Sequence, residues 1–203
     1  ASTRPLILHG GGYENSVPGG EVFLNDVCAY PFRFKGQRVW ARQLNPETYE
    51  HQPMIENDGG ALWVLGLKTE KDRTIIGTVN GGKTEVLGGL LYKNRETVGP
   101  APAFTIRDAS ASLVYRNKWR DYEVQVAEWR GGVLHTMNAD ETPASHRRVT
   151  LYRSHENTNE PGVRRGGEPR VWVVAQRHPD ASDAGPGTAE QPFASIAPAA
   201  KWA

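Results

Sequence analysis

The chain has 203 residues, of which 24 are basic and 23 acidic, so its net charge is +1. This balance argues against a nucleic-acid-binding protein, which needs a basic field, and no apolar run is long enough to span a membrane. Cys28 is the single cysteine, which excludes an internal disulfide. The length suffices for one large domain, or for one domain and a short additional unit.

Short strands separated by turns are expected along the first half of the chain. The apolar runs are brief and rich in Val, Leu, Ile and Trp, a composition typical of strands. Gly, Asn, Asp and Pro, which favour turns, separate them. The expected strands up to residue 91 are 5–9, 21–27, 32–34, 39–44, 54–56, 62–67, 74–79 and 84–91.

A repeat of 22 or 23 residues connects the strands in the middle of this stretch. Trp40 recurs as Trp63 after 23 residues, and the glycine pair at 59–60 recurs at 81–82 after 22. Such a period indicates a solenoid, in which each repeat must stack on its neighbours to bury its apolar face. We therefore predict an all-β, right-handed parallel β-helix in which 39–44, 62–67 and 84–91 lie parallel and in register in one sheet.

The pattern loosens after residue 91. Further strands are expected at 103–107, 112–115, 122–130, 133–136 and 148–153, the last in a less regular cap. Residues 156–170 contain almost no apolar side chain and are the predicted linker. A strand from residue 171, a turn-rich loop at 178–188 and a helix capped by Ser195 are expected beyond it. The predicted division is 1–155 for the β-helix and its cap, 156–170 for the linker, and 171–203 for a second unit.

Two parts of the sequence carry a resemblance. The segments HGGGYENSVPGGEVFLNDV, VWARQLNPE, NDGGALWVLGLKTE and GGKTEVLGGLLY, within residues 5–153, resemble the later coils of right-handed β-helices of the pectate-lyase-like superfamily. The resemblance implies a secreted or cell-surface protein that acts on polysaccharide, as a polysaccharide lyase or a glycoside hydrolase. The alternative is a non-catalytic structural or glycan-binding β-helix, such as a tailspike or an adhesin-like shaft.

The second resemblance lies at residues 171–203. VWVVAQRHPDASDAGPGTAEQPFASIAPAA is similar to the opening of a β-helix domain. The end of one β-helix would then precede the truncated start of another, and the chain is expected to be a fragment of a longer parent. No signal peptide is visible. We expect the 203-residue chain by itself to bind polysaccharide weakly and to cleave it poorly or not at all.

Four charged residues are weak catalytic candidates: Asp58, Lys68, Glu70 and Glu85. Hydrolysis needs two carboxylates that flank the bond, whereas elimination needs a base such as Lys or Arg. The repeat could bring these residues to one surface, and it aligns Glu47 with Glu70. The alternative is that they are ordinary solvated charges, since Glu70 opens the charged turn EKDR. No catalytic motif of a characterised family member matches the chain.

Trp40, Trp63 and Arg42 are candidates for substrate binding. The repeat stacks Trp40 on Trp63, with Glu85 next in the same column and Arg42 close by. If this strand face points outward, the aromatic ladder suits the apolar faces of sugar rings. If it points inward, the tryptophans belong to the core, and the alternation of the strand allows both.

Neither a metal nor a cofactor is implied by a specific motif. No two histidines have the spacing of zinc ligands. Asp180 and Asp183 could bind Ca²⁺ from their loop, but Asp in such a loop more often makes turn hydrogen bonds.

Overall fold

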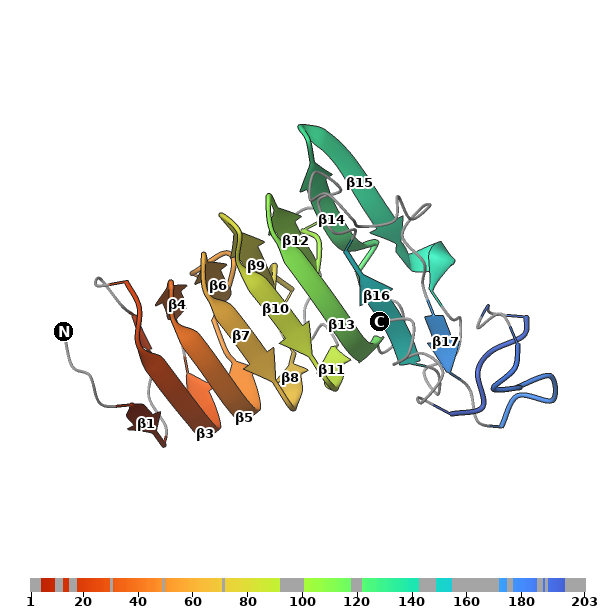
Figure 1. Cartoon of the computed structure of the whole chain (residues 1–203), viewed down its shortest axis with the longest axis horizontal. Coiled ribbons are helices and arrows are strands. Elements are labelled where there is room, and N and C mark those ends of the chain that lie inside the picture. Colours follow the sequence, from red (N-terminus) through yellow and green to blue (C-terminus); the bar gives the residue numbers. More distant parts are fainter. Residues whose placement is uncertain are drawn as a thin grey trace.

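The computed structural model describes residues 5–9, 13–14, 18–29, 31–48, 50–70, 72–91, 101–117, 122–142, 149–154, 172–174, 177–185, 188 and 190–195. Over these residues the chain is all-β, with a single short 3-10 helix, η1 (Ala139–Glu141). The strands form two sheets. Figure 1 shows the strands arranged side by side along the long axis of the molecule, from β1 at one end to β17 at the other.

The two sheets, here called sheet A and sheet B, are built mainly from parallel strands. Sheet A contains β1 (Leu6–Leu8), β3 (Glu21–Ala29), β5 (Arg38–Pro46), β7 (Ala61–Val64), β8 (Leu67–Thr69), β10 (Lys83–Val86), β11 (Gly89–Leu91), β13 (Ser110–Asn117), β16 (Val149–Arg153) and β17 (Trp172–Val174). Sheet B contains β2 (Tyr13–Glu14), β4 (Phe32–Lys35), β6 (Ile55–Asp58), β9 (Ile76–Val79), β12 (Phe104–Arg107), β14 (Val124–Arg130) and β15 (Val133–Asn138).

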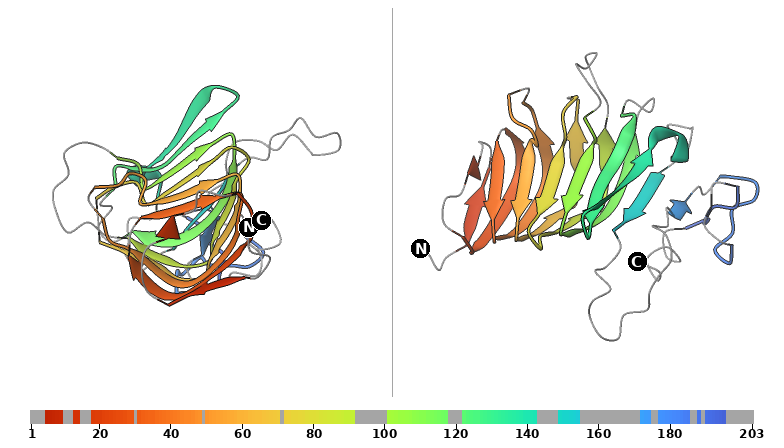
Figure 2. Two further views of the ribbon diagram at one scale, coloured as in Figure 1. Left: turned by 90° about the vertical axis from the view of Figure 1, so that its left-hand side faces the viewer. Right: turned by 90° about the horizontal axis from the view of Figure 1, so that it is seen from above.

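Each coil runs along sheet B, turns, and returns along sheet A, which makes the chain a parallel β-solenoid. Seen along the long axis, successive coils superimpose as one closed outline (Figure 2). The predicted stacking is confirmed, because β5, β7 and β10 pair in parallel, with Val39 opposite Leu62 and Leu62 opposite Thr84. The repeat is not constant along the whole axis. Val22 pairs with Val39 after 17 residues, and Thr84 pairs with Ala111 after 27.

The corners of the coils explain where the glycines fall. Gly59 has φ +68° in the turn from sheet B to sheet A, a conformation that glycine adopts at little steric cost. Its N–H donates to Val79 O of the next coil at 3.0 Å. At the next corner, between β7 and β8, Gly66 lies against Gln43, where a Cβ atom would be 2.9 Å from Gln43 Oε1. The turns therefore set both the shape of a coil and its distance from the next one.

The core follows from the alternation of each strand. In β5, Val39 and Ala41 are buried while Trp40 between them is only partly so. Equivalent inward residues stack from coil to coil and form one continuous cluster. One such column in sheet B contains Phe32, Ile55, Ile76, Phe104 and Val126.

One inward column is partly polar. Asn57 is fully buried, and its Nδ2 donates to Lys83 O at 2.9 Å and to Thr84 Oγ1 at 3.1 Å. Thr84 Oγ1 is also 2.8 Å from Thr78 Oγ1. These bonds connect the side chain of one coil with the backbone of the next, so they fix the stacking of the two coils.

The parallel order ends at the C-terminal end of the solenoid. β14 and β15 form an antiparallel hairpin, and β16 lies antiparallel on β13. β17 then pairs antiparallel with β16 and contacts Phe193 through Val174, so residues 172–174 dock as a strand on the cap. The predicted linker at 156–170 and the helix expected after Ser195 lie outside the described residues.

Candidate functional site

An aromatic row lies on the outer face of sheet A. Phe23 of β3, Trp40 of β5 and Trp63 of β7 stand directly opposite one another in the parallel register. The neighbouring residues of each strand point into the core, so these three side chains point outward. Ile7 precedes the row, and Glu85 and Ser112 follow it on β10 and β13. Of the two orientations that the sequence allowed for the tryptophans, the structure shows the outward one.

The rings of this row, here called the aromatic ladder, stack on one another. The centroids of Phe23 and Trp40 are 4.8 Å apart with an interplanar angle of 9°, and those of Trp40 and Trp63 are 5.2 Å apart at 12°. Contacting carbon atoms lie about 3.5–4 Å apart, so these nearly parallel rings are displaced sideways. Each ring covers only part of the next, and the ladder is stepped, not flat. It ends at Trp63, because the next residue in the row is Glu85.

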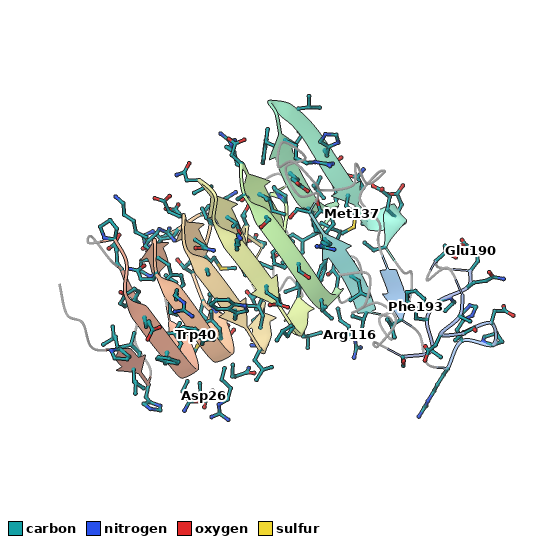
Figure 3. The ribbon with its side chains drawn as sticks, viewed as in Figure 1. Asp26, Trp40, Arg116, Met137, Glu190 and Phe193 are labelled. Atoms are coloured by element: carbon teal, nitrogen blue, oxygen red, sulfur yellow. The ribbon has the colours of Figure 1, made fainter. Side chains whose placement is uncertain are left out.

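Polar rows flank the ladder on both sides. Arg38 forms an ion pair with Glu21 at 3.2 Å, and its guanidinium lies 5.1 Å from the Trp40 ring centroid. On the other side, Arg42 donates through Nε to Asn25 Oδ1 at 2.5 Å. Asn25 in turn lies 3.2 Å from His9 Nδ1. Figure 3 shows Trp40 at the outer side of the sheet. The predicted proximity of Arg42 to Trp40 follows from their positions two residues apart on β5.

The end of the ladder is more apolar. Trp63 is flanked by Ala61 on β7 and by Leu65, the residue that follows β7 and is 57% exposed. Leu87 on the next coil is 47% exposed and lies at the same corner. The aromatic ladder is thus bordered by hydrogen-bonding groups near Trp40 and by aliphatic groups near Trp63. Such a surface can contact the apolar face of a sugar ring through its aromatic rings and the sugar hydroxyls through its polar groups.

Two of the four catalytic candidates come together at the end of β8. Lys68 Nζ forms an ion pair with Glu70 and lies 3.8 Å from Glu47 Oε1. All three side chains are partly exposed. The alignment of Glu47 with Glu70 in the sequence thus corresponds to a shared lysine partner. The other two candidates lie in other rows: Glu85 follows the aromatic ladder, and Asp58 ends β6, where it accepts a hydrogen bond from Asn80 at 2.7 Å.

A third group, which sequence reasoning missed, lies inside the C-terminal end of the solenoid. Glu128 of β14 is fully buried and accepts a hydrogen bond from the Tyr152 hydroxyl. Burial raises the pKa of Glu128 above its ordinary value, while the Tyr152 hydrogen bond and the charges of Arg130 and His135 act in the opposite direction. The signal in the sequence is that Glu128 has the same parity along β14 as Val124 and Val126, which places it on the apolar face of the strand.

In the loop that carries Asp180 and Asp183, the Asp183 carboxylate makes hydrogen bonds within the chain and Asp180 Oδ2 lies 4.0 Å from His178 Nδ1. Asp183 accepts hydrogen bonds from Ser195 N at 2.6 Å and from Ser195 Oγ at 2.7 Å. The Ser195 hydroxyl lowers the pKa of Asp183. Asp180 N donates to His178 Nδ1 at 3.2 Å. Asp183 thus makes loop hydrogen bonds of the kind that Asp commonly makes in turns.

Within the described ranges, no group of three or more His, Cys, Asp or Glu side chains is placed to hold a metal ion. No helix in the described part of the chain is long and apolar enough to cross a membrane. Comparison with known protein families, with curated proteins and with solved structures finds no match for the chain.

Proposed function

We propose that the protein is a polysaccharide-binding β-solenoid, and that its ligand lies along the outer face of sheet A. The observation that carries this proposal is the aromatic ladder, in which three outward rings occupy the same position on successive coils. Aromatic residues on a solvent-facing strand surface contribute nothing to the inner core. Their regular spacing along the long axis suits a polymer with repeating apolar faces.

The direction of the ligand follows from the direction of the ladder. The ladder runs from coil to coil, at right angles to the strands, so a polymer chain in contact with all three rings runs along the solenoid axis. Arg38 and Arg42 then lie on opposite sides of the ligand at Trp40, where their N–H groups can donate to hydroxyl oxygens. Stacking and hydrogen bonding of this kind supply affinity, whereas catalysis requires groups that act on the transition state.

A secreted or cell-surface location is part of the same proposal. Its support is the resemblance of residues 5–153 to the later coils of secreted β-helix proteins, together with a ligand class found outside the cell.

The first test is affinity electrophoresis of the purified chain in gels that contain a panel of soluble neutral and acidic polysaccharides. At least one polysaccharide should retard the wild-type chain. Trp63→Ala should weaken that retardation about tenfold or more, because truncating an aromatic anchor commonly costs more than 1.4 kcal/mol of binding energy. The matched control is Trp129→Ala, which removes a tryptophan from sheet B that lies beneath Arg107. Equal loss in both variants, or no retardation by any polysaccharide, would contradict the proposal.

A second candidate function is polysaccharide cleavage, as a lyase or a hydrolase. The specific observation in its favour is the placement of Lys68 between Glu47 and Glu70, since a lysine and two carboxylates are groups that such chemistry uses. The ion pairs of these residues also suit a purely structural role at the end of β8. The balance favours binding, because the three side chains are engaged with one another.

We expect the purified chain to release neither reducing ends nor unsaturated products from any polysaccharide that it binds. The measurement is a reducing-end assay combined with ultraviolet absorbance, run to long incubation times. Product release that disappears in Glu70→Gln and in Lys68→Met, with binding retained, would instead place an active centre at the end of β8.

A further inference from the structure

The C-terminal cap contains a carboxylate that the proposed binding face does not use. Glu128 continues an inward column of sheet B, where it pairs with Ile106 on the preceding coil. Its side chain therefore lies at the end of the apolar interior, and it is fully buried. An ionised carboxylate in such a position is costly unless its charge is compensated.

The groups that face Glu128 come from β14, β15 and β16. Tyr152 of β16 donates its hydroxyl hydrogen to Oε2, and Arg130 of β14 brings Nε to 3.4 Å from Oε1. His135 is the residue opposite Glu128 on β15 and is exposed. Tyr115 of β13, also buried, neighbours Tyr152. Within the described part of the chain, Oε1 of Glu128 and both Nε and Nη2 of Arg130 are buried without a hydrogen-bond partner. Among the described residues, Glu128 and Arg130 thus form an ion pair without a hydrogen bond between Oε1 and Nε.

The bond between Glu128 and Tyr152 crosses from one sheet to the other. Glu128 belongs to sheet B, whereas β16 belongs to sheet A, where Tyr152 pairs with Leu113 of β13. β16 also carries β17, and Ser154 ties its end to Ala111 through N–H···O at 2.8 Å. Separation of β16 from the solenoid would therefore admit water to Glu128 and release β17 at the same time.

We propose that Glu128 and Tyr152 form an acid-tightened latch, which holds β16 and β17 against the end of the solenoid more firmly as the pH falls. Protonated Glu128 carries no charge that must be compensated in the interior, and its remaining oxygen still accepts the hydrogen bond from Tyr152. The latch governs how firmly the C-terminal strands are attached. It is independent of the binding face, which lies on the outer side of β3, β5 and β7.

The direction of the pH effect follows from linkage. Burial is the largest influence on Glu128 and raises its pKa in the closed state, whereas opening exposes the carboxyl to water and returns the pKa to its ordinary value. The closed state then binds the proton more tightly than the open state. Its advantage is complete below the ordinary glutamate pKa and is lost as the pH rises through the raised value.

Amide hydrogen exchange of the wild-type chain, followed by NMR between pH 5 and pH 8, tests the latch. The protection factors of Thr150, Leu151 and Val173, corrected for intrinsic exchange, should rise on acidification by up to about tenfold per pH unit within the titration range of one carboxyl. Protection in β5 and β7 should not follow this change. A fall in protection on acidification would show that the charge pair with Arg130 governs the cap, and it would overturn the proposal.

Glu128→Gln is the decisive variant, because glutamine keeps the shape and an acceptor for Tyr152 but cannot ionise. We expect the pH response of β16 to disappear and its protection at pH 8 to match that of the wild type at pH 5. His135→Ala is the control, because it removes the imidazole opposite Glu128 on β15, and it should retain the response. If Glu128→Gln does not fold, a ¹³C titration of the Glu128 carboxyl in the wild type decides. An ordinary or lowered pKa there, or an unchanged pH response in Glu128→Gln, would contradict the latch.

Discussion

Replacement of Gly60 by alanine is expected to lower the free energy of unfolding by about 3 kcal/mol. A Cβ atom at this position would collide with Gln37 O of the preceding coil and would lie 2.9 Å from Asn57 Oδ1. Gln37 O cannot move away freely, because it accepts a hydrogen bond from Ala61 N at 2.8 Å. The strain therefore falls on the backbone contact that sets the spacing of two coils.

Gly88→Ala is the matched control for this prediction. Gly88 also lies at a corner of a coil, but the nearest atom to an added Cβ is Leu65 O at 3.5 Å, an ordinary contact. We expect Gly88→Ala to change the stability by less than about 1 kcal/mol. The measurement is chemical denaturation followed by circular dichroism. Similar stabilities for the two variants would show that the close approach of the coils at Gly60 is not a constraint.

The second large effect is expected for Asn57→Ala, with a loss of about 2–3 kcal/mol. The substitution removes the donor that serves Lys83 O and Thr84 Oγ1 on the next coil and leaves these atoms buried without it. It also leaves a space in a column that is otherwise filled. The cost combines an unsatisfied carbonyl with a small cavity, and both lie between the same two coils.

Asn25→Ala serves as its control, since Asn25 makes side-chain hydrogen bonds on the outer face of sheet A, to His9 and Arg42. Groups at the surface can exchange such bonds for bonds to water, so we expect a loss below about 1 kcal/mol. Thermal and chemical denaturation of the two variants provide the comparison. An Asn57→Ala variant as stable as Asn25→Ala would mean that the interior bonds contribute little.

The solenoid could be predicted because stacking leaves a regular trace in the sequence. Trp40 and Trp63, and the glycine pairs at 59–60 and 81–82, repeat because equivalent positions in successive coils meet the same constraints. The coils around them were harder to recognise as repeats. Their pairing offsets of 17 and 27 residues arise because loops outside the sheets can change length without disturbing the strand register.

The side on which a residue lies could not always be predicted. Val39 and Trp40 are both apolar, so alternation alone did not show which of them faced the core, and the small Ala41 proved to share the inward side with Val39. The expected strand 54–56 ends before Asn57, yet the Asn57 side chain points inward and bonds to the next coil. Glu128 shares the parity of Val124 and Val126 in β14, but only the contacts with β15 and β16 show that its carboxylate is covered. Each case depends on contacts between segments distant in sequence.

The most direct test of the proposed function is an NMR titration of the indole N–H groups of the wild-type chain with the polysaccharide fragments that retard it in gels. The indole resonances of Trp40 and Trp63 are expected to shift in a saturable way, because both rings lie on the outer face of sheet A. The indole resonance of Trp129 on β14 should stay unchanged. Saturable shifts confined to Trp129, with Trp40 and Trp63 unaffected, would place the ligand elsewhere and contradict the proposal.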